Sequence, residues 1–99
     1  MLTLDFSFTT TLWKWRGGNW FFLTLPPSTA ADIRAFAAGN ASALGTVRVV
    51  ARVGETEWQT SLFPSREHES LLLPVKAAVR KAEGLEADAE VAVALEVFV

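Results

Sequence analysis

The chain has 99 residues, of which 51% are hydrophobic and 20% charged, and it contains no cysteine. This length is typical of a single domain, and the composition is sufficient for a packed core. The absence of cysteine excludes disulfides, zinc ribbons and thiolate nucleophiles, and the net charge of −2 makes the chain a poor generic binder of nucleic acid, whose non-specific affinity depends on neutralising phosphates.

Two apolar patterns predict the first two strands. Residues 2–12 alternate between apolar and polar side chains, which is the period of a half-buried strand. The phase flips at Trp13, as expected where a bulge re-aims a strand or where both of its sides are covered. After a Gly-Gly-Asn turn at residues 17–19, the nearly unbroken apolar run at residues 20–25 predicts a strand that is buried on both faces.

Residues 46–53 and 56–63 form the clearest hairpin. Gly54 stands at the first central position of the connection, which favours a type II′ turn. This register places Arg52 opposite Glu57 and sorts apolar and polar side chains onto opposite faces, as expected for a sheet with one buried side.

Two short helices are expected, over residues 28–38 and 75–83. Ser28 or Thr29 can cap the first helix, and Pro74 suits the first turn of the second. Gly39 and Asn40 are expected to end the first helix, and Gly84 the second. The buried stripe of the second helix is expected to consist of Val75, Ala78, Val79 and Ala82.

Further strands are expected to end at residues 71–73 and to occupy residues 91–99. The whole pattern gives six or seven strands and two short helices within a single domain over residues 1–99. Such strands are best closed as a small barrel, because closure removes exposed sheet edges. We therefore predict a mainly β fold, a small closed or partly open barrel. The opening residues lack the features of a signal peptide and no stretch is long enough to span a bilayer, so we expect a cytoplasmic protein.

A Ser-Leu-Phe-Pro segment at residues 61–64 is followed by Leu-Pro-Val-Lys-Ala-Ala-Val-Arg-Lys-Ala at residues 73–82 and Gly-Leu at residues 84–85. In these segments the sequence resembles the DUF1905 family of small bacterial domains of unknown function. The resemblance implies a double-split β-barrel, a class that also holds the AbrB-type transition regulators. The chain departs from many relatives by having no glycine at residues 67–70 or 87–89, where a close backbone approach to a ligand would favour one.

The first candidate site combines Ser61, Arg66, Lys76 and Arg80. Lys76 and Arg80 are four residues apart and share one face of the expected helix. If all four side chains converge at a barrel mouth, they can hold a carboxylate or a phosphate, for which arginine offers two parallel donors. The alternative is that the basic residues solubilise the helix and complement its dipole.

The second candidate site combines Trp13, Lys14, Trp15 and Trp20, with Arg16 beside them. Aromatic rings interleaved with basic residues are typical of sites for single-stranded nucleic acid or planar ligands. Tryptophan rings that cap a barrel end explain the same residues without a ligand, since large rings commonly fill the core of a small domain.

The single histidine, His68, stands between two glutamates in a polar turn. It can take part in proton transfer or contribute to a metal site, although a lone histidine in such a turn is usually solvated. No serine lies in a Gly-x-Ser-x-Gly segment and no glycine-rich phosphate loop is present, so we expect no catalytic residues, metal or cofactor.

We therefore predict a non-enzymatic binding or interaction module, monomeric or homodimeric, for a small anionic ligand or a protein partner. The alternatives are an AbrB-like dimer that binds nucleic acid, which the fold analogy favours and the net charge opposes, and an enzyme that uses His68.

Overall fold

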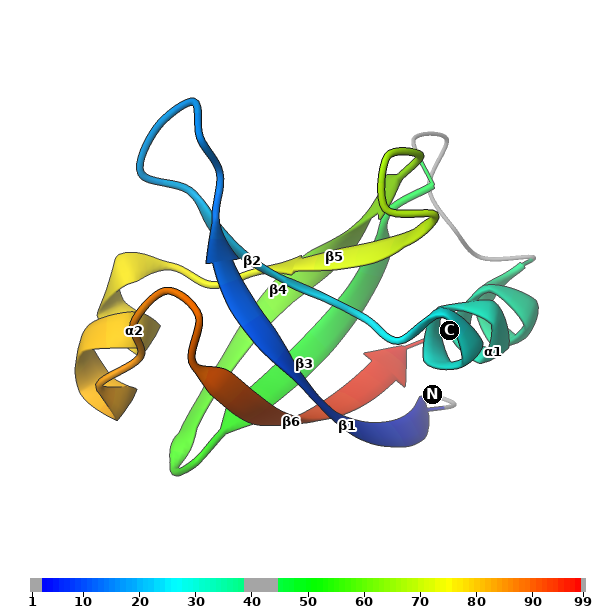
Figure 1. Ribbon diagram of the computed structural model, residues 1–99. Helices are drawn as coiled ribbons and strands as arrows, with labels where there is room; N and C mark the ends of the chain where they lie inside the picture. The colour runs from blue at the N-terminus through cyan, green and yellow to red at the C-terminus, as the bar shows by residue number, and fades with distance from the viewer. Residues whose placement is uncertain (1–2, 39–44, 99) are drawn as a thin grey trace.

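The computed structural model describes residues 3–38 and 45–98, which form a closed barrel of six antiparallel strands flanked by two short helices (Figure 1). This confirms the fold class predicted from the sequence. The strands follow one another around the barrel in the order β1-β2-β5-β4-β3-β6. The elements are β1 (Thr3–Lys14), β2 (Phe21–Thr24), α1 (Pro27–Ala37), β3 (Val47–Val53), β4 (Thr56–Ser65), β5 (Ser70–Pro74), α2 (Ala77–Glu83) and β6 (Glu90–Phe98).

Alternate residues of each strand fill the barrel. Every second side chain of β3 and β6 is buried, and the residues between them face outward. Burying a valine or leucine side chain contributes roughly 1.5–3 kcal/mol, so these aliphatic rows supply much of the stabilising free energy. The buried side chains from the two strands are Val47, Val49, Ala51, Val53, Val91, Val93, Leu95 and Val97.

The hairpin of β3 and β4 has the predicted register. Arg52 pairs with Glu57, as the alternation of faces required. Gly54 has a φ of 58° and the next residue does not have a positive φ, which is the pattern of a type II′ turn. Strand β4 extends two residues further than expected, to Ser65.

Strand β1 keeps its alternation of inward and outward side chains through Leu12, so the phase flip at Trp13 marks an apolar outer face and not a bulge. It pairs with β6 from Thr3 to Thr11 and with β2 from Leu12 to Lys14. Leu12 is fully buried, so Trp13 faces outward from the barrel wall.

Strand β2 is not buried on both faces, so that prediction was wrong. Leu23 is fully buried, whereas Phe22 is half-buried and Trp20, just before the strand, is 61% exposed. The outward side of β2 therefore carries aromatic rings that reach solvent.

Helix α1 begins at Pro27, and no side chain caps it, so the caps predicted at Ser28 or Thr29 were wrong. Proline suits this position because its missing N–H would be unpaired in a first turn anyway. Arg34 anchors the helix to β5 by donating to the carbonyl oxygen of Ser70 at 3.0 Å. The stop predicted at Gly39 and Asn40 lies outside the described residues.

Helix α2 begins at Ala77, later than expected, because Pro74 ends β5 instead of opening the helix. Val79 is its buried residue, while Ala78 and Ala82 are exposed, so the predicted stripe was too wide. The predicted end is confirmed: Gly84 is left-handed and the N–H of Leu85 donates to the carbonyl oxygen of Arg80 at 2.8 Å. Among the described residues, no helix has the length and apolar character needed to cross a membrane.

Candidate functional site

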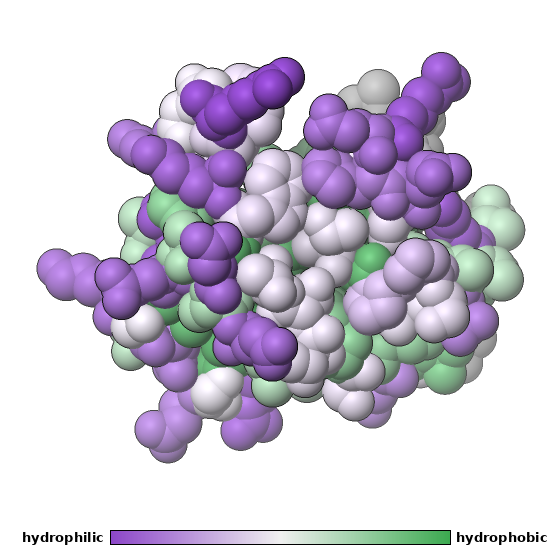
Figure 2. Space-filling model, in the orientation of Figure 1, coloured by the Kyte–Doolittle hydropathy of each residue, from purple (hydrophilic) through white to green (hydrophobic). Residues whose placement is uncertain are grey.

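A cleft of about 570 Å³ lies on the outside of the barrel, between two raised loops. One loop joins β1 to β2 and the other joins β4 to β5 (Figure 1). Each loop precedes one strand of the antiparallel β2–β5 pair, so the two loops lie at opposite ends of that pair. Figure 2 shows the hollow between the two lobes at the top of the molecule. We call it the aromatic cleft, and it is lined by Trp13, Trp15, Trp20, Phe22, Ser65, Arg66, Glu67, His68 and Leu72.

The floor of the aromatic cleft is formed by outward side chains of three neighbouring strands. Trp13 of β1 pairs directly with Phe22 of β2, and their ring centroids are 5.2 Å apart at an angle of 38°. Leu72 of β5 adds an aliphatic surface between the fully buried Leu71 and Leu73. The inward neighbours are locked in the core, so the pleat fixes the direction of the floor residues.

Trp13 is held in place from two sides. Its Nε1–H donates to Oγ1 of Thr24 at 2.8 Å, and Oγ1 of Thr10 donates to the carbonyl oxygen of Thr24 at 2.9 Å. The imidazole of His68 stacks on the indole with centroids 4.8 Å apart at 29°. A ring fixed in this way loses little conformational freedom when a ligand stacks on it.

His68 is half-buried in the wall of the aromatic cleft, contrary to the solvated position expected from the sequence. Oγ of Ser65 lies 3.0 Å from its Nδ1 and accepts the backbone N–H of His68 at 3.3 Å. These contacts, together with the stacking on Trp13, orient the ring as a surface. In the described part of the chain, no cluster of three or more His, Asp or Glu could hold a metal ion.

The opposite wall consists of Trp15 and Trp20. The N–H of Trp15 donates to the carbonyl oxygen of Trp20 at 2.8 Å, which closes the loop. The ring of Trp20 lies nearly parallel to that of Phe22, with centroids 6.4 Å apart and an interplanar angle of 11°. Trp15 is 46% exposed and Trp20 is 61% exposed. A side chain at Gly17 would meet the far edge of the Trp15 ring, so the exposed indole would have to shift to make room for it.

The lining of the aromatic cleft contains one cation and one anion. Arg66 and Glu67 belong to its lining. Lys14 and Arg16 are exposed in the segment that carries Trp15, although they are not part of the lining itself. The three tryptophans of the second candidate site therefore line one cleft together with Arg66 from the first candidate site, whereas Lys14 lies outside its lining.

The model of a family described as Domain of unknown function (DUF1905) matches residues 8–95. The chain belongs to the DUF1905 family. The matched segment contains every residue of the aromatic cleft, but the family brings no activity with it. No curated protein matches the sequence.

The structure does not gather the anion site predicted from Ser61, Arg66, Lys76 and Arg80 into one cavity of this DUF1905 domain. Arg66 lines the aromatic cleft, whereas Lys76 and Arg80 line a second cavity of about 380 Å³. Ser61 pairs with Arg48 in the β3–β4 hairpin and lines neither.

Four cleft residues of the domain were missed by sequence reasoning as candidates: Phe22, Ser65, Glu67 and Leu72. Phe22 could have been found, since it is two residues from Trp20 and so shares its side of a strand. The other three reach the cleft because β5 pairs with β2, and no local pattern signals that pairing.

Proposed function

We propose that this DUF1905 domain is a non-enzymatic binding module that holds a planar ligand bearing an anionic group in the aromatic cleft. The observation that carries the proposal is the exposure of fixed aromatic rings on an outer wall, where the barrel core does not use them. The proposal keeps the cytoplasmic location, and the monomeric or homodimeric state, that we expect from the sequence.

The tryptophans divide into two kinds, which supports a role beyond folding. Trp58 is 6% exposed and belongs to the core. Trp15 is 46% exposed and Trp20 is 61% exposed, and the interior of the barrel is already filled by residues such as Leu12 and Leu23. Large apolar side chains that gather at one exposed place are typical of interaction sites.

The shape of the aromatic cleft favours a flat ligand, and Arg66 offers a contact for an anionic group. Trp13 and Phe22 offer a fixed aromatic floor, and the walls of Trp20 and His68 stand beside it. Rings of this kind bind flat surfaces by offset or tilted stacking. Arg66 at the edge can give a carboxylate or phosphate two parallel donors.

The test is a titration followed by tryptophan fluorescence, with thymidine monophosphate, thymidine and inorganic phosphate as probes. We expect the nucleotide to bind more tightly than the nucleoside, because it adds an anion to the same ring, and phosphate alone to bind weakest. The anionic dye anilinonaphthalene sulfonate serves as a second planar probe.

Three variants locate the binding. Trp20→Ala should weaken both the nucleotide and the nucleoside, while Arg66→Ala should weaken the nucleotide alone. Arg52→Ala is the matched control, since it removes an exposed cation from the far side of the barrel. Failure of both planar anions to bind at millimolar concentration, or equal binding by the Trp20 variant, contradicts the proposal.

No chemical step is proposed, and the role of His68 is to form one side of the aromatic cleft and contact the ligand. An enzyme that uses His68 remains the alternative. An activity that is found in the wild type and lost in His68→Ala, with thymidine monophosphate binding retained, would support that alternative against ours.

A further inference from the structure

Trp20 lines both the aromatic cleft and the second cavity. Trp20 is 61% exposed and its ring lies nearly parallel to that of Phe22. Because it lines both cavities, the ring separates them and can contact a ligand in either one. The second cavity also contains Phe21, Lys76 and Arg80. The two cavities therefore meet at one aromatic ring and have cations on both sides of it.

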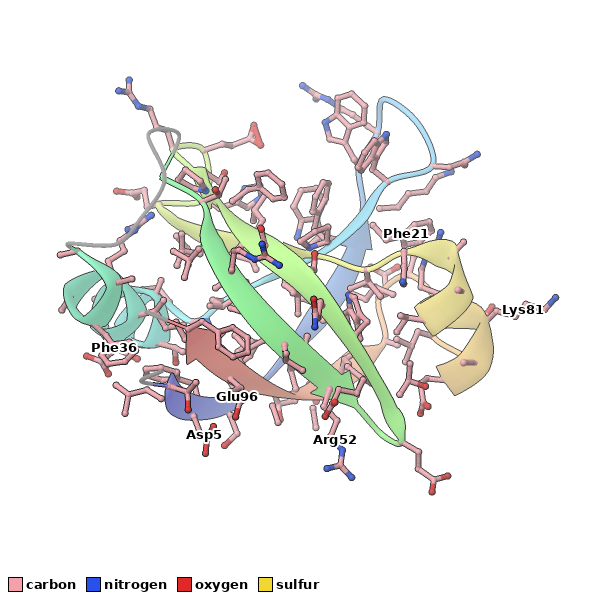
Figure 3. The ribbon with its side chains drawn as sticks, turned by 180° about the vertical axis from the view of Figure 1, so that it is seen from behind. Asp5, Phe21, Phe36, Arg52, Lys81 and Glu96 are labelled. Atoms are coloured by element: carbon pink, nitrogen blue, oxygen red, sulfur yellow. The ribbon has the colours of Figure 1, made fainter. Side chains whose placement is uncertain are left out.

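Arg80 is positioned in the second cavity before any ligand arrives. Its guanidinium carbon lies 3.8 Å above the centroid of the Phe21 ring, and its Nε–H donates to the carbonyl oxygen of Val75 at 3.2 Å. Figure 3 shows Phe21 beside α2, whereas Lys81 on the same helix points away into solvent. The terminal N–H groups of Arg80 thus belong to an anchored side chain and can meet an anion with little loss of entropy.

The charges are sorted by side in a way that the net charge of −2 conceals. The two cavities are lined by Arg66, Lys76 and Arg80 and by one carboxylate, that of Glu67. The opposite side of the barrel pairs Asp5 with Glu96, which Figure 3 shows close together. The net charge of the whole chain predicts weak binding of nucleic acid, but the side that carries the two cavities is locally positive.

Resting on the proposed function, we propose that the ligand is a short single-stranded nucleic acid, with one base in the aromatic cleft and its backbone passing Trp20 to Lys76 and Arg80. A single strand alternates flat rings with anions, and its bases are free to stack on aromatic side chains. A duplex keeps its bases paired, and an uncharged proline-rich peptide would leave the cations without partners. The charge complementarity decides among them.

The experiment compares ligands of increasing length by tryptophan fluorescence: thymidine monophosphate, then thymidine oligonucleotides of two, four and eight residues. We expect the affinity to rise at least about 10-fold from the monomer to the tetramer, since a second contact on the same chain acts at high effective concentration. Further lengthening should add little. A duplex of eight base pairs and a decaproline peptide should bind more weakly than the single strand.

The decisive variant is Lys76→Met with Arg80→Met, which removes both cations and keeps an aliphatic chain over Phe21. It should lower tetramer affinity about 10-fold and leave monomer affinity unchanged. It should also make the slope of log affinity against log salt shallower by about 1.4, the value for two phosphate contacts on a single strand. Lys81→Met is the matched control and should change neither quantity.

The outcomes separate this inference from the proposed function. Monomer binding that depends on Trp20 and Arg66, without any gain from length, keeps the cleft and overturns the single strand. Equal loss of monomer and tetramer affinity in the double variant, or no loss of either, also overturns it. Tighter binding of decaproline or of the duplex assigns the groove to a different partner.

Discussion

The outer surface of this barrel has two contrasting sides. On one side, β1, β6 and β3 present small or charged residues to solvent, among them Thr9, Ala92 and Arg52. On the other, the end of β1 with β2 and β5 presents Trp13, Phe22 and Leu72. Both sides cover the same kind of aliphatic interior, so packing of the core does not account for the difference.

The contrast indicates what folding alone requires of the outer wall. The polar side shows that small or charged outward residues suffice for a strand in this barrel. The aromatic side adds rings that contact one another and are still exposed, which is a pattern of recognition surfaces. Variants on each side can show whether the two sides differ in stability, in binding or in both.

The largest effect on stability is expected in the core of the barrel. Leu23→Ala should lower the free energy of unfolding by about 2–5 kcal/mol, because it leaves a cavity at a fully buried position. Urea denaturation measures it. A loss below about 1 kcal/mol would show that the interior is loosely packed. The two outer sides could then no longer be compared as surfaces over the same packed core.

Two positions on β1 compare the sides directly. Trp13→Ala removes the contacts with Phe22 and His68 and the hydrogen bond to Thr24, and should cost about 1–3 kcal/mol. Thr9→Ala on the polar side should change stability by less than about 0.5 kcal/mol. Thermal unfolding of the two variants checks this, and equal costs would erase the distinction between a built floor and a solvated side.

The polar side contains a repulsion that can be reversed. Asp5 and Glu96 are directly opposite each other on neighbouring antiparallel strands. Asp5→Lys should raise the free energy of unfolding by about 0.2–1 kcal/mol, since a like-charge pair becomes an opposite-charge pair. The gain should shrink in 1 M salt, where exposed charges are screened. A gain that persists in high salt would mean that charge is not its cause.

The smallest effect on stability is expected at Trp20. Trp20→Ala should change the free energy of unfolding by less than about 0.5 kcal/mol, because the indole is 61% exposed. Urea denaturation beside a binding titration checks it. A loss comparable to that of Leu23→Ala would make Trp20 part of the fold rather than part of a site.

Local sequence patterns predicted much of the fold. Gly54 and the alternation around it gave the register of the hairpin, and Gly84 with Leu85 gave the end of α2. The width of the α2 stripe was overestimated because Ala78 and Ala82 fit a helical period but face solvent. Small residues are poor markers of burial, since alanine is tolerated on both sides of a helix.

The candidate site was harder to predict than the fold. Trp13, Trp15 and Trp20 were recognised as one candidate group, but the sequence left open whether they cover the end of the barrel or lie on the outer face of β1 and β2. The turn that carries His68 comes opposite them through the pairing of β2 with β5, which connects segments about fifty residues apart. Such long-range pairings are set by the whole barrel and leave no local trace.

The most direct test of the aromatic cleft is an NMR titration that follows the four indole N–H signals. With thymidine monophosphate, we expect the signals of Trp13, Trp15 and Trp20 to shift along one saturable curve. The signal of Trp58, which is 6% exposed and lines the second cavity but not the aromatic cleft, should move least of the four. Unchanged signals from all four indoles at saturating nucleotide, or a shift confined to Trp58, would contradict the account.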